Sequence, residues 1–117
     1  MDSILTSINK LLGIEESYEY FDTDIIIHIN SAFSDLTQLG VGPAEGFRIS
    51  DSYATWKDFT KDEIKLESVK DLIYLKVRLI FDPPSSSYVL TAFENRIKEL
   101  EWRLNVAAES ISKESEV

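Results

Sequence analysis

Four pairs of acidic residues and one histidine are the side chains whose types and spacing could do chemistry. Two carboxyl groups close together can share general acid–base work, and the pairs are Asp22/Asp24, Glu15/Glu16, Asp62/Glu63 and Glu99/Glu101. Helix caps and solvated helix faces explain every pair, because none lies in the apolar surroundings that an acid–base catalyst needs. His28 has no second histidine and no cysteine to complete a zinc site, so we expect a structural or surface residue.

Sequence motifs with a known mechanism are not found in the chain. Gly40 and Gly42 invite comparison with a phosphate-cradling loop, but no strand precedes them and no GxGxxG or Walker pattern is present. A helix stop followed by a turn is therefore favoured there. The chain also lacks the GxSxG, HExxH and DxDxDG patterns. We predict no enzyme activity, no cofactor and no metal site.

The composition indicates one small acidic domain. The chain has 117 residues, of which 44% are hydrophobic, and this suits a single domain with a modest core. Its 21 acidic and 12 basic residues give a formal net charge of -9, which repels nucleic acid at long range. The chain has no cysteine, so disulfides and thiolate sites are excluded. Neither a signal peptide nor a membrane-spanning run is evident, so a cytoplasmic location is expected.

The most apolar stretch, residues 66–84, is expected to organise the fold. Eight of the ten residues from 72 to 81 are apolar or aromatic, and only two basic residues interrupt them. A buried strand is the alternative, but the length of the run and the spacing of its apolar residues favour a helix. Such an apolar helix must be covered on most sides. Pro83 and Pro84 stop it, which predicts a central helix over residues 61–82.

Three further helices follow from apolar residues that recur at steps of three and four. Residues 2–12 form a helix with Ser3 as N-cap, and it is too short to stand alone. Residues 22–39 form the next helix, with Asp22 as its N-cap. Residues 88–108 form the last one, which carries a heptad-like apolar seam of Ser86, Leu90, Phe93, Ile97, Leu100, Leu104 and Ala107.

A loop or a short β-hairpin is predicted between the second and the central helix. Residues 40–46 contain three of the four glycines, and a polar turn follows them. Thr55 and Asp58 have the spacing of a capping box that opens a short helical turn ending at Phe59. The aromatic residues here form a cluster that holds the loop down, a protruding contact surface, or both. We take as candidate partner-binding residues Phe47, Ile49, Tyr53, Trp56 and Phe59, together with Trp102 on the last helix.

These elements predict a mainly α fold, a small bundle of about four helices with one loop or hairpin excursion. Residues 1–108 form the helical domain. Residues 109–117 are polar and charged with little to bury, so they are expected to form a mobile C-terminal tail or to order on a partner.

Three stretches of the sequence are distinctive in combination. They are SILTSINKLLGI at residues 3–14, FDTDIIIHINS at 21–31 followed by LGVGP at 39–43, and LESVK at 66–70 through IYLKVRLIFDPP at 73–84 with LEWRLNV at 100–106. Together they resemble the small head-tail connector, or adaptor, proteins of long-tailed phages and prophages. The resemblance extends from residue 3 to about residue 108.

The resemblance implies a helical structural protein of the virion with no catalytic residues. Family members assemble as a ring of about twelve subunits beneath the portal protein, extend the DNA channel and offer a platform to the next neck or tail-completion protein. The implied location is the virion neck, after a stage in the cytoplasm of the bacterial host, with DNA passing through non-specifically and no membrane contact. Residues 40–59 would project from the body, the tail would be free to reach the portal, and the next subunit would cover part of the surface around Tyr74, Leu75 and Phe81.

The alternative is an acidic helical adaptor or regulatory module that binds a basic protein partner. A mimic of DNA would align its carboxylates along one exposed face. On the last helix the acids are instead interleaved with basic residues, in pairs such as Glu94–Lys98 and Glu99–Arg103. This interleaving favours the connector.

Overall fold

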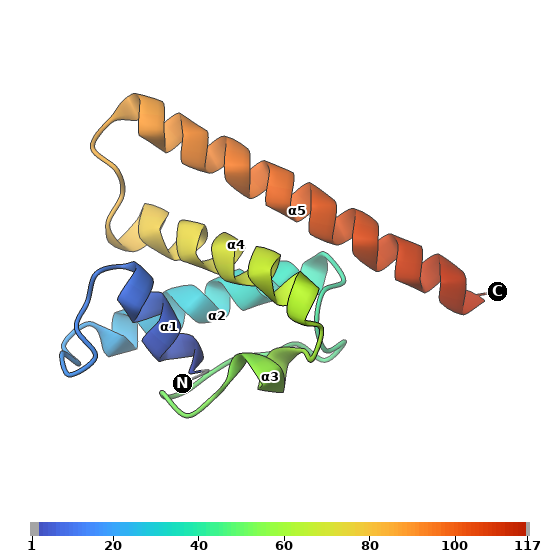
Figure 1. The fold of residues 1–117 in the computed structure, drawn as a ribbon, viewed down its shortest axis with the longest axis horizontal. Helices are drawn as coiled ribbons and strands as arrows, with labels where there is room; N and C mark the ends of the chain where they lie inside the picture. The colour runs from blue at the N-terminus through green and yellow to red at the C-terminus, as the bar shows by residue number, and fades with distance from the viewer. Residues whose placement is uncertain (1–2, 117) are drawn as a thin grey trace.

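A computed structural model describes the backbone of residues 3–116 and the side chains of residues 3–109. The described part is mainly α, as predicted, and the helices lie side by side with a long loop folded beneath them (Figure 1). The helices are α1 Ile4–Leu11, α2 Asp22–Gln38, α3 Trp56–Phe59, α4 Glu63–Phe81 and α5 Ser87–Glu116. α4 packs against α1, α2 and α5, so the apolar stretch does organise the fold.

Local capping signals set most of the helix starts. The Ser3 hydroxyl accepts a hydrogen bond from the Thr6 amide at 3.2 Å, as predicted for an N-cap. Thr55 and Asp58 form the predicted capping box at the start of α3. Asp22 is not an N-cap, contrary to prediction. Phe21 occupies that position, and the Asp22 carboxylate accepts a hydrogen bond from the Asn9 side-chain amide at 3.1 Å, which ties α2 to α1.

The segment between α2 and α3 is a loop, and the predicted hairpin alternative is wrong. Within the described residues the only β pairing is an isolated bridge between Ser3 and Thr55. Instead, the Asn30 side chain on α2 makes the hydrogen bonds that a partner strand would make. Its Nδ2 donates to the Ile49 carbonyl at 2.9 Å, and its Oδ1 accepts from the Ile49 amide at 2.7 Å. One side chain thus satisfies both polar groups of a backbone unit that would otherwise need a second strand.

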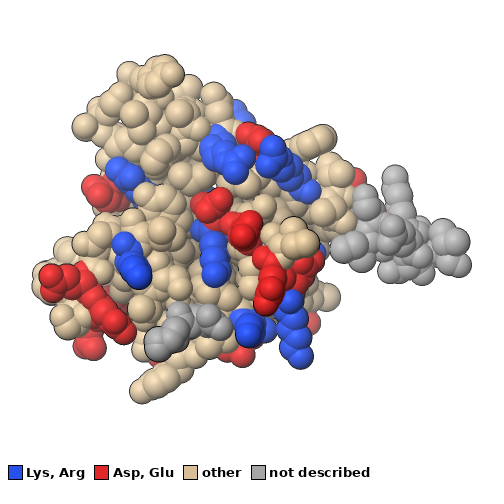
Figure 2. Space-filling model, viewed as in Figure 1, with Lys and Arg blue, Asp and Glu red and all other residues tan. Residues whose placement is uncertain are grey.

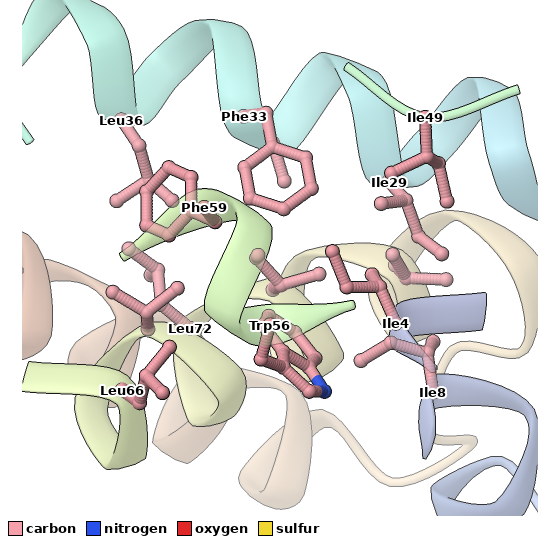
Figure 3. Close-up of a cluster of buried hydrophobic side chains, with 14 of the residues drawn as sticks. Ile4, Ile8, Ile29, Phe33, Leu36, Ile49, Trp56, Phe59, Leu66 and Leu72 are labelled. Atoms are coloured by element: carbon pink, nitrogen blue, oxygen red, sulfur yellow. The ribbon is translucent and has the colours of Figure 1, made fainter. Parts of the chain in front are cut away.

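The hydrophobic core lies between α1, α2 and α4 and is closed from below by α3 and the loop (Figure 3). The core residues of α4 include Leu66, Val69, Leu72, Ile73 and Val77. α1 is only eight residues long and depends on this packing, since an isolated helix of that length is unstable in water. Burial of Ile4 and Ile8 against α4 and the loop provides that packing.

The last helix, α5, docks along one stripe and is longer than predicted. Leu100 and Leu104 are buried and Phe93 is half-buried, which confirms the middle of the predicted seam. The end of the seam is wrong, because Ala107 is exposed and Ala108 packs against the core in its place. The helical backbone continues to Glu116 instead of ending near residue 108. The mobile tail over 109–117 stays a prediction, since the side chains after residue 109, and residue 117 altogether, lie outside the described part.

Replacement of Gly42 by alanine should destabilise the fold through two separate effects. Gly42 has a φ of 88°, in the left-handed region that costs a residue with a Cβ about 1–2 kcal/mol. A Cβ there would also overlap the Phe59 ring, and overpacking of this kind adds about 1 kcal/mol or more. We expect the free energy of unfolding, measured by urea denaturation, to fall by roughly 2–3 kcal/mol.

Gly13 provides the matched control for this substitution. Its φ of 80° is similar, but a Cβ added there meets no atom within 4 Å. Gly13→Ala should therefore lose only the backbone contribution of about 1 kcal/mol. Equal losses for the two variants would contradict the tight contact between Gly42 and Phe59.

Candidate functional site

Most of the aromatic residues proposed from sequence as partner contacts gather inside the protein around Phe33 of α2. The ring centroids of Phe59 and Trp56 lie 4.9 Å and 6.5 Å from that of Phe33 (Figure 3). The ring centroid of Phe47 lies 5.0 Å from that of Phe33. Trp56 also donates a hydrogen bond from Nε1 to the Ser7 hydroxyl at 3.2 Å, which joins α3 to α1. The rings of Phe47, Trp56 and Phe59 therefore form one side of the hydrophobic core.

Most of the predicted contact residues in the loop before α3 and in α3 lie in the interior of the protein. Ile49, Trp56 and Phe59 are buried, and Phe47 is half-buried. The cluster that holds the loop down is what the structure shows. These side chains do not form a protruding surface, because they pack inward and the Asn30 side chain hydrogen-bonds the loop to α2.

Two of the proposed contact residues remain at the surface. Tyr53 is exposed in the loop before α3, and Trp102 is 67% exposed on α5 beside the partly exposed Val106. Trp102 and Val106 are four residues apart on one helix, so their side chains are neighbours. The structure therefore does not bring the six predicted residues together into one site. A role for Tyr53 and Trp102 in binding a partner stays a prediction.

A surface that the sequence interpretation missed lies at the turn between α4 and α5. Residues 83–93, which we call the uncharged tip, contain no acidic or basic residue, although the whole chain carries a net charge of -9. Figure 2 shows this end of the molecule, at upper left, as an area without charged side chains. Tyr88 is 84% exposed there, and Val89 is also exposed. The run of uncharged residues between Asp82 and Glu94 is the sequence signal that could have identified it.

A second surface is a groove of about 540 Å³ between α2 and the loop segment 45–48, which we call the α2 groove. The α2 side of the groove is uncharged and consists of Ile27, Asn30, Ser31, Ser34, Thr37 and Gln38. Its other wall is formed by Glu45, Gly46, Phe47 and Arg48. Ile27 is largely exposed at the rim, so the groove offers an apolar edge next to hydroxyl and amide groups.

The strongest electrostatic feature is Lys76 of α4, which joins three helices. Its Nζ lies 2.6 Å from a carboxylate oxygen of Asp35 on α2 and 3.0 Å from one of Glu101 on α5. Burial alone would lower the pKa of Lys76, but the hydrogen bonds and charges of the two carboxylates outweigh burial and raise its pKa above 10.5. In the sequence, Lys76 is only one of the two basic residues that interrupt the apolar stretch. Its role could not be seen there, because its partners are distant in the chain.

Replacement of Lys76 by methionine tests this three-helix link. Methionine keeps the apolar stem but leaves Asp35 and Glu101 as neighbouring carboxylates without their cation. We expect a loss of about 1–2 kcal/mol in the free energy of unfolding near pH 7, measured by urea denaturation. The pKa of Lys76 is raised in the folded state, so the contribution is fully present below pH 10.5 and declines as the pH rises through the folded-state pKa.

The matched control is Lys57→Met, since Lys57 is exposed on α3. This change should alter stability by no more than about 0.5 kcal/mol. An unchanged stability of Lys76→Met, or an equal loss in both variants, would show that the link contributes nothing.

The described part of the chain offers no obvious chemistry to go with these surfaces. Among the described side chains, those of residues 3–109, no three His, Cys, Asp or Glu are grouped so that they could hold a metal ion. No helix in that same part is both long and apolar enough to cross a membrane.

Comparison with known proteins identifies the family of the chain. No curated protein and no solved structure matches it significantly. A protein-family model does match, and its description is "Phage connector protein". The match covers residues 4–110, from the first residue of α1 well into α5. The three sequence stretches that resemble head-tail connectors lie almost entirely within it, and the chain belongs to the phage connector protein family.

Proposed function

We propose that this protein forms a ring below the portal of a phage particle, extends the DNA channel and joins the head to the neck or tail. Membership of the connector family carries the broader statement of a structural role alongside other virion proteins. The ring, its stoichiometry of about twelve subunits and the portal as a direct partner are the parts that we add.

The observation that carries the proposal is the amount of apolar surface that α5 leaves uncovered. α5 docks on α4 through one stripe centred on Leu100 and Leu104. On its other sides, Tyr88, Trp102 and Val106 are exposed. A subunit in a closed ring needs two different contact patches, one for each neighbour. Exposed apolar residues at separate positions along one helix are consistent with that need.

The charge of the protein also fits a channel through which DNA must move. DNA binds strongly to surfaces rich in lysine and arginine, because phosphate contacts release counterions. A protein with a net charge of -9 makes few such contacts. A ring of these subunits would let DNA slide without holding it.

The direct test is to mix the purified protein with the portal protein of the same phage and to measure particle mass and shape by mass photometry and electron microscopy. We expect a ring of this protein stacked on the portal. A chain that stays monomeric at high concentration and does not bind the portal would contradict the proposal. The gene neighbourhood gives an independent check, because a connector gene is expected between head genes and tail genes.

A further inference from the structure

We propose that the uncharged tip of one subunit seats in the α2 groove of the next subunit, with Tyr88 as the inserted side chain. The inference rests on the proposed ring and adds to it the two surfaces that meet. The partner is a second copy of this chain.

The distribution of charge argues for a second copy as the occupant. Two copies that each carry a net charge of -9 repel one another, and the repulsion is smallest where both contacting surfaces lack charge. The tip has no charged residue, and the α2 side of the groove has none. A basic partner would gain more from the acidic surfaces of the chain than from these two.

The chemistry of the two surfaces is complementary. The groove places the hydroxyls of Ser31 and Ser34 beside the apolar rim at Ile27. The tip presents a ring with a polar end at Tyr88, preceded by three consecutive serines. Tyrosine is enriched among the residues that dominate binding energy, because a large rigid ring carries a hydroxyl that finds a partner. The groove volume of about 540 Å³ lies in the range of pockets that accept such groups.

The arrangement of the two surfaces favours assembly in one direction. The tip lies at the α4–α5 turn, while segment 45–48 lies toward the opposite end of the molecule (Figure 1). A contact between two different surfaces is heterologous, so a pair of subunits still has one free tip and one free groove. Such contacts propagate from subunit to subunit and close into a ring when the rotation per subunit allows it.

The absence of cysteine from the chain permits a clean cross-linking experiment. Variants Val89→Cys, which keeps the inserted Tyr88 ring beside it, and Ser34→Cys are mixed and assembled on the portal. The samples are treated with a short bifunctional maleimide, and dimers are separated on a denaturing gel. We expect a cross-linked dimer from the mixture and none from either variant alone. Ser17→Cys, at an exposed position in the α1–α2 loop, replaces Ser34→Cys in the control mixture and should give no dimer.

Particle mass measured on the same samples separates this inference from the ring itself. Rings without the Val89–Ser34 cross-link would overturn the docking and leave the proposed function intact. A dimer from Val89→Cys alone would mean that tips meet each other, which also overturns the docking. Samples that remain monomeric with the portal present would overturn both.

A charge placed on the tip gives a second test that does not depend on cross-linking. Tyr88→Glu should reduce the apparent association constant of ring assembly at least tenfold, because a carboxylate would lose its hydration against the uncharged α2 side of the groove. Its thermal stability as a monomer should stay unchanged, since Tyr88 is exposed. Tyr20→Glu is the matched control, because Tyr20 is 78% exposed in the α1–α2 loop and should assemble normally. Normal assembly of Tyr88→Glu would overturn the docking.

Discussion

Replacement of Leu72 by aspartate is expected to leave the protein unfolded at room temperature. Leu72 is completely buried on α4, in the core that α4 forms with its neighbouring helices. An unpaired polar or charged group in such a place costs several kcal/mol, which is comparable with the total stability of about 5–15 kcal/mol for a small domain. Circular dichroism and urea denaturation of the purified variant would measure the loss. Val77→Asp should behave in the same way, because Val77 is equally buried.

The same helix provides the control. Ile64 is 86% exposed in the first turn of α4, where a negative charge interacts favourably with the helix dipole. Ile64→Asp should change the free energy of unfolding by no more than about 0.5 kcal/mol. A folded Leu72→Asp variant with an unchanged urea midpoint would show that α4 is not the centre of the core.

Replacement of Trp56 by alanine is expected to lower the free energy of unfolding by about 3–5 kcal/mol. Trp56 is buried among α1, α3 and α4, its Nε1 bonds to Ser7, and Lys70 of α4 lies over its ring at 5.4 Å. Its removal would leave a large cavity under α1 and would remove the hydrogen bond that joins α3 to α1. Thermal denaturation followed by circular dichroism would measure the effect.

The second tryptophan makes the comparison informative. Trp102→Ala should leave the stability of the monomer within about 0.5 kcal/mol, because this side chain is largely exposed. If Trp102 binds a partner as predicted, the variant should instead assemble less well. Stable Trp56→Ala protein with defective assembly would restore the interpretation of Trp56 as a contact residue.

Local sequence signals were sufficient for the elements that local physics determines. The apolar spacing located α2 and α4 to within two residues at each end. The Thr55–Asp58 capping box was predicted correctly because both hydrogen bonds form within four residues of chain. The Glu99–Arg103 pair was predicted for the same reason and is present on α5.

The features that the sequence did not reveal depend on contacts between distant parts of the chain. The positions of Trp56 and Phe59 in the sequence do not indicate whether their side chains face the core or the solvent. Lys76 gained its importance from Asp35, which is 41 residues away. Asn30 replaced a hairpin with a side-chain bond to Ile49. The uncharged tip was not predicted for a different reason. Residues 83–93 are distinguished by having no charged residue and not by a cluster of aromatic residues.

The attachment of α1 to the α3 region has a consequence for how the chain folds as it is synthesised. The bond between Ser7 and Trp56 joins residues 49 apart, and the Ile4 amide bonds to the Ala54 carbonyl. α1 leaves the ribosome before α3 but cannot become a stable helix by itself. At roughly 5–20 residues per second, several seconds pass before its docking partners emerge. During this interval Ile4 and Ile8 stay exposed, so α1 is the segment that we expect chaperones to bind.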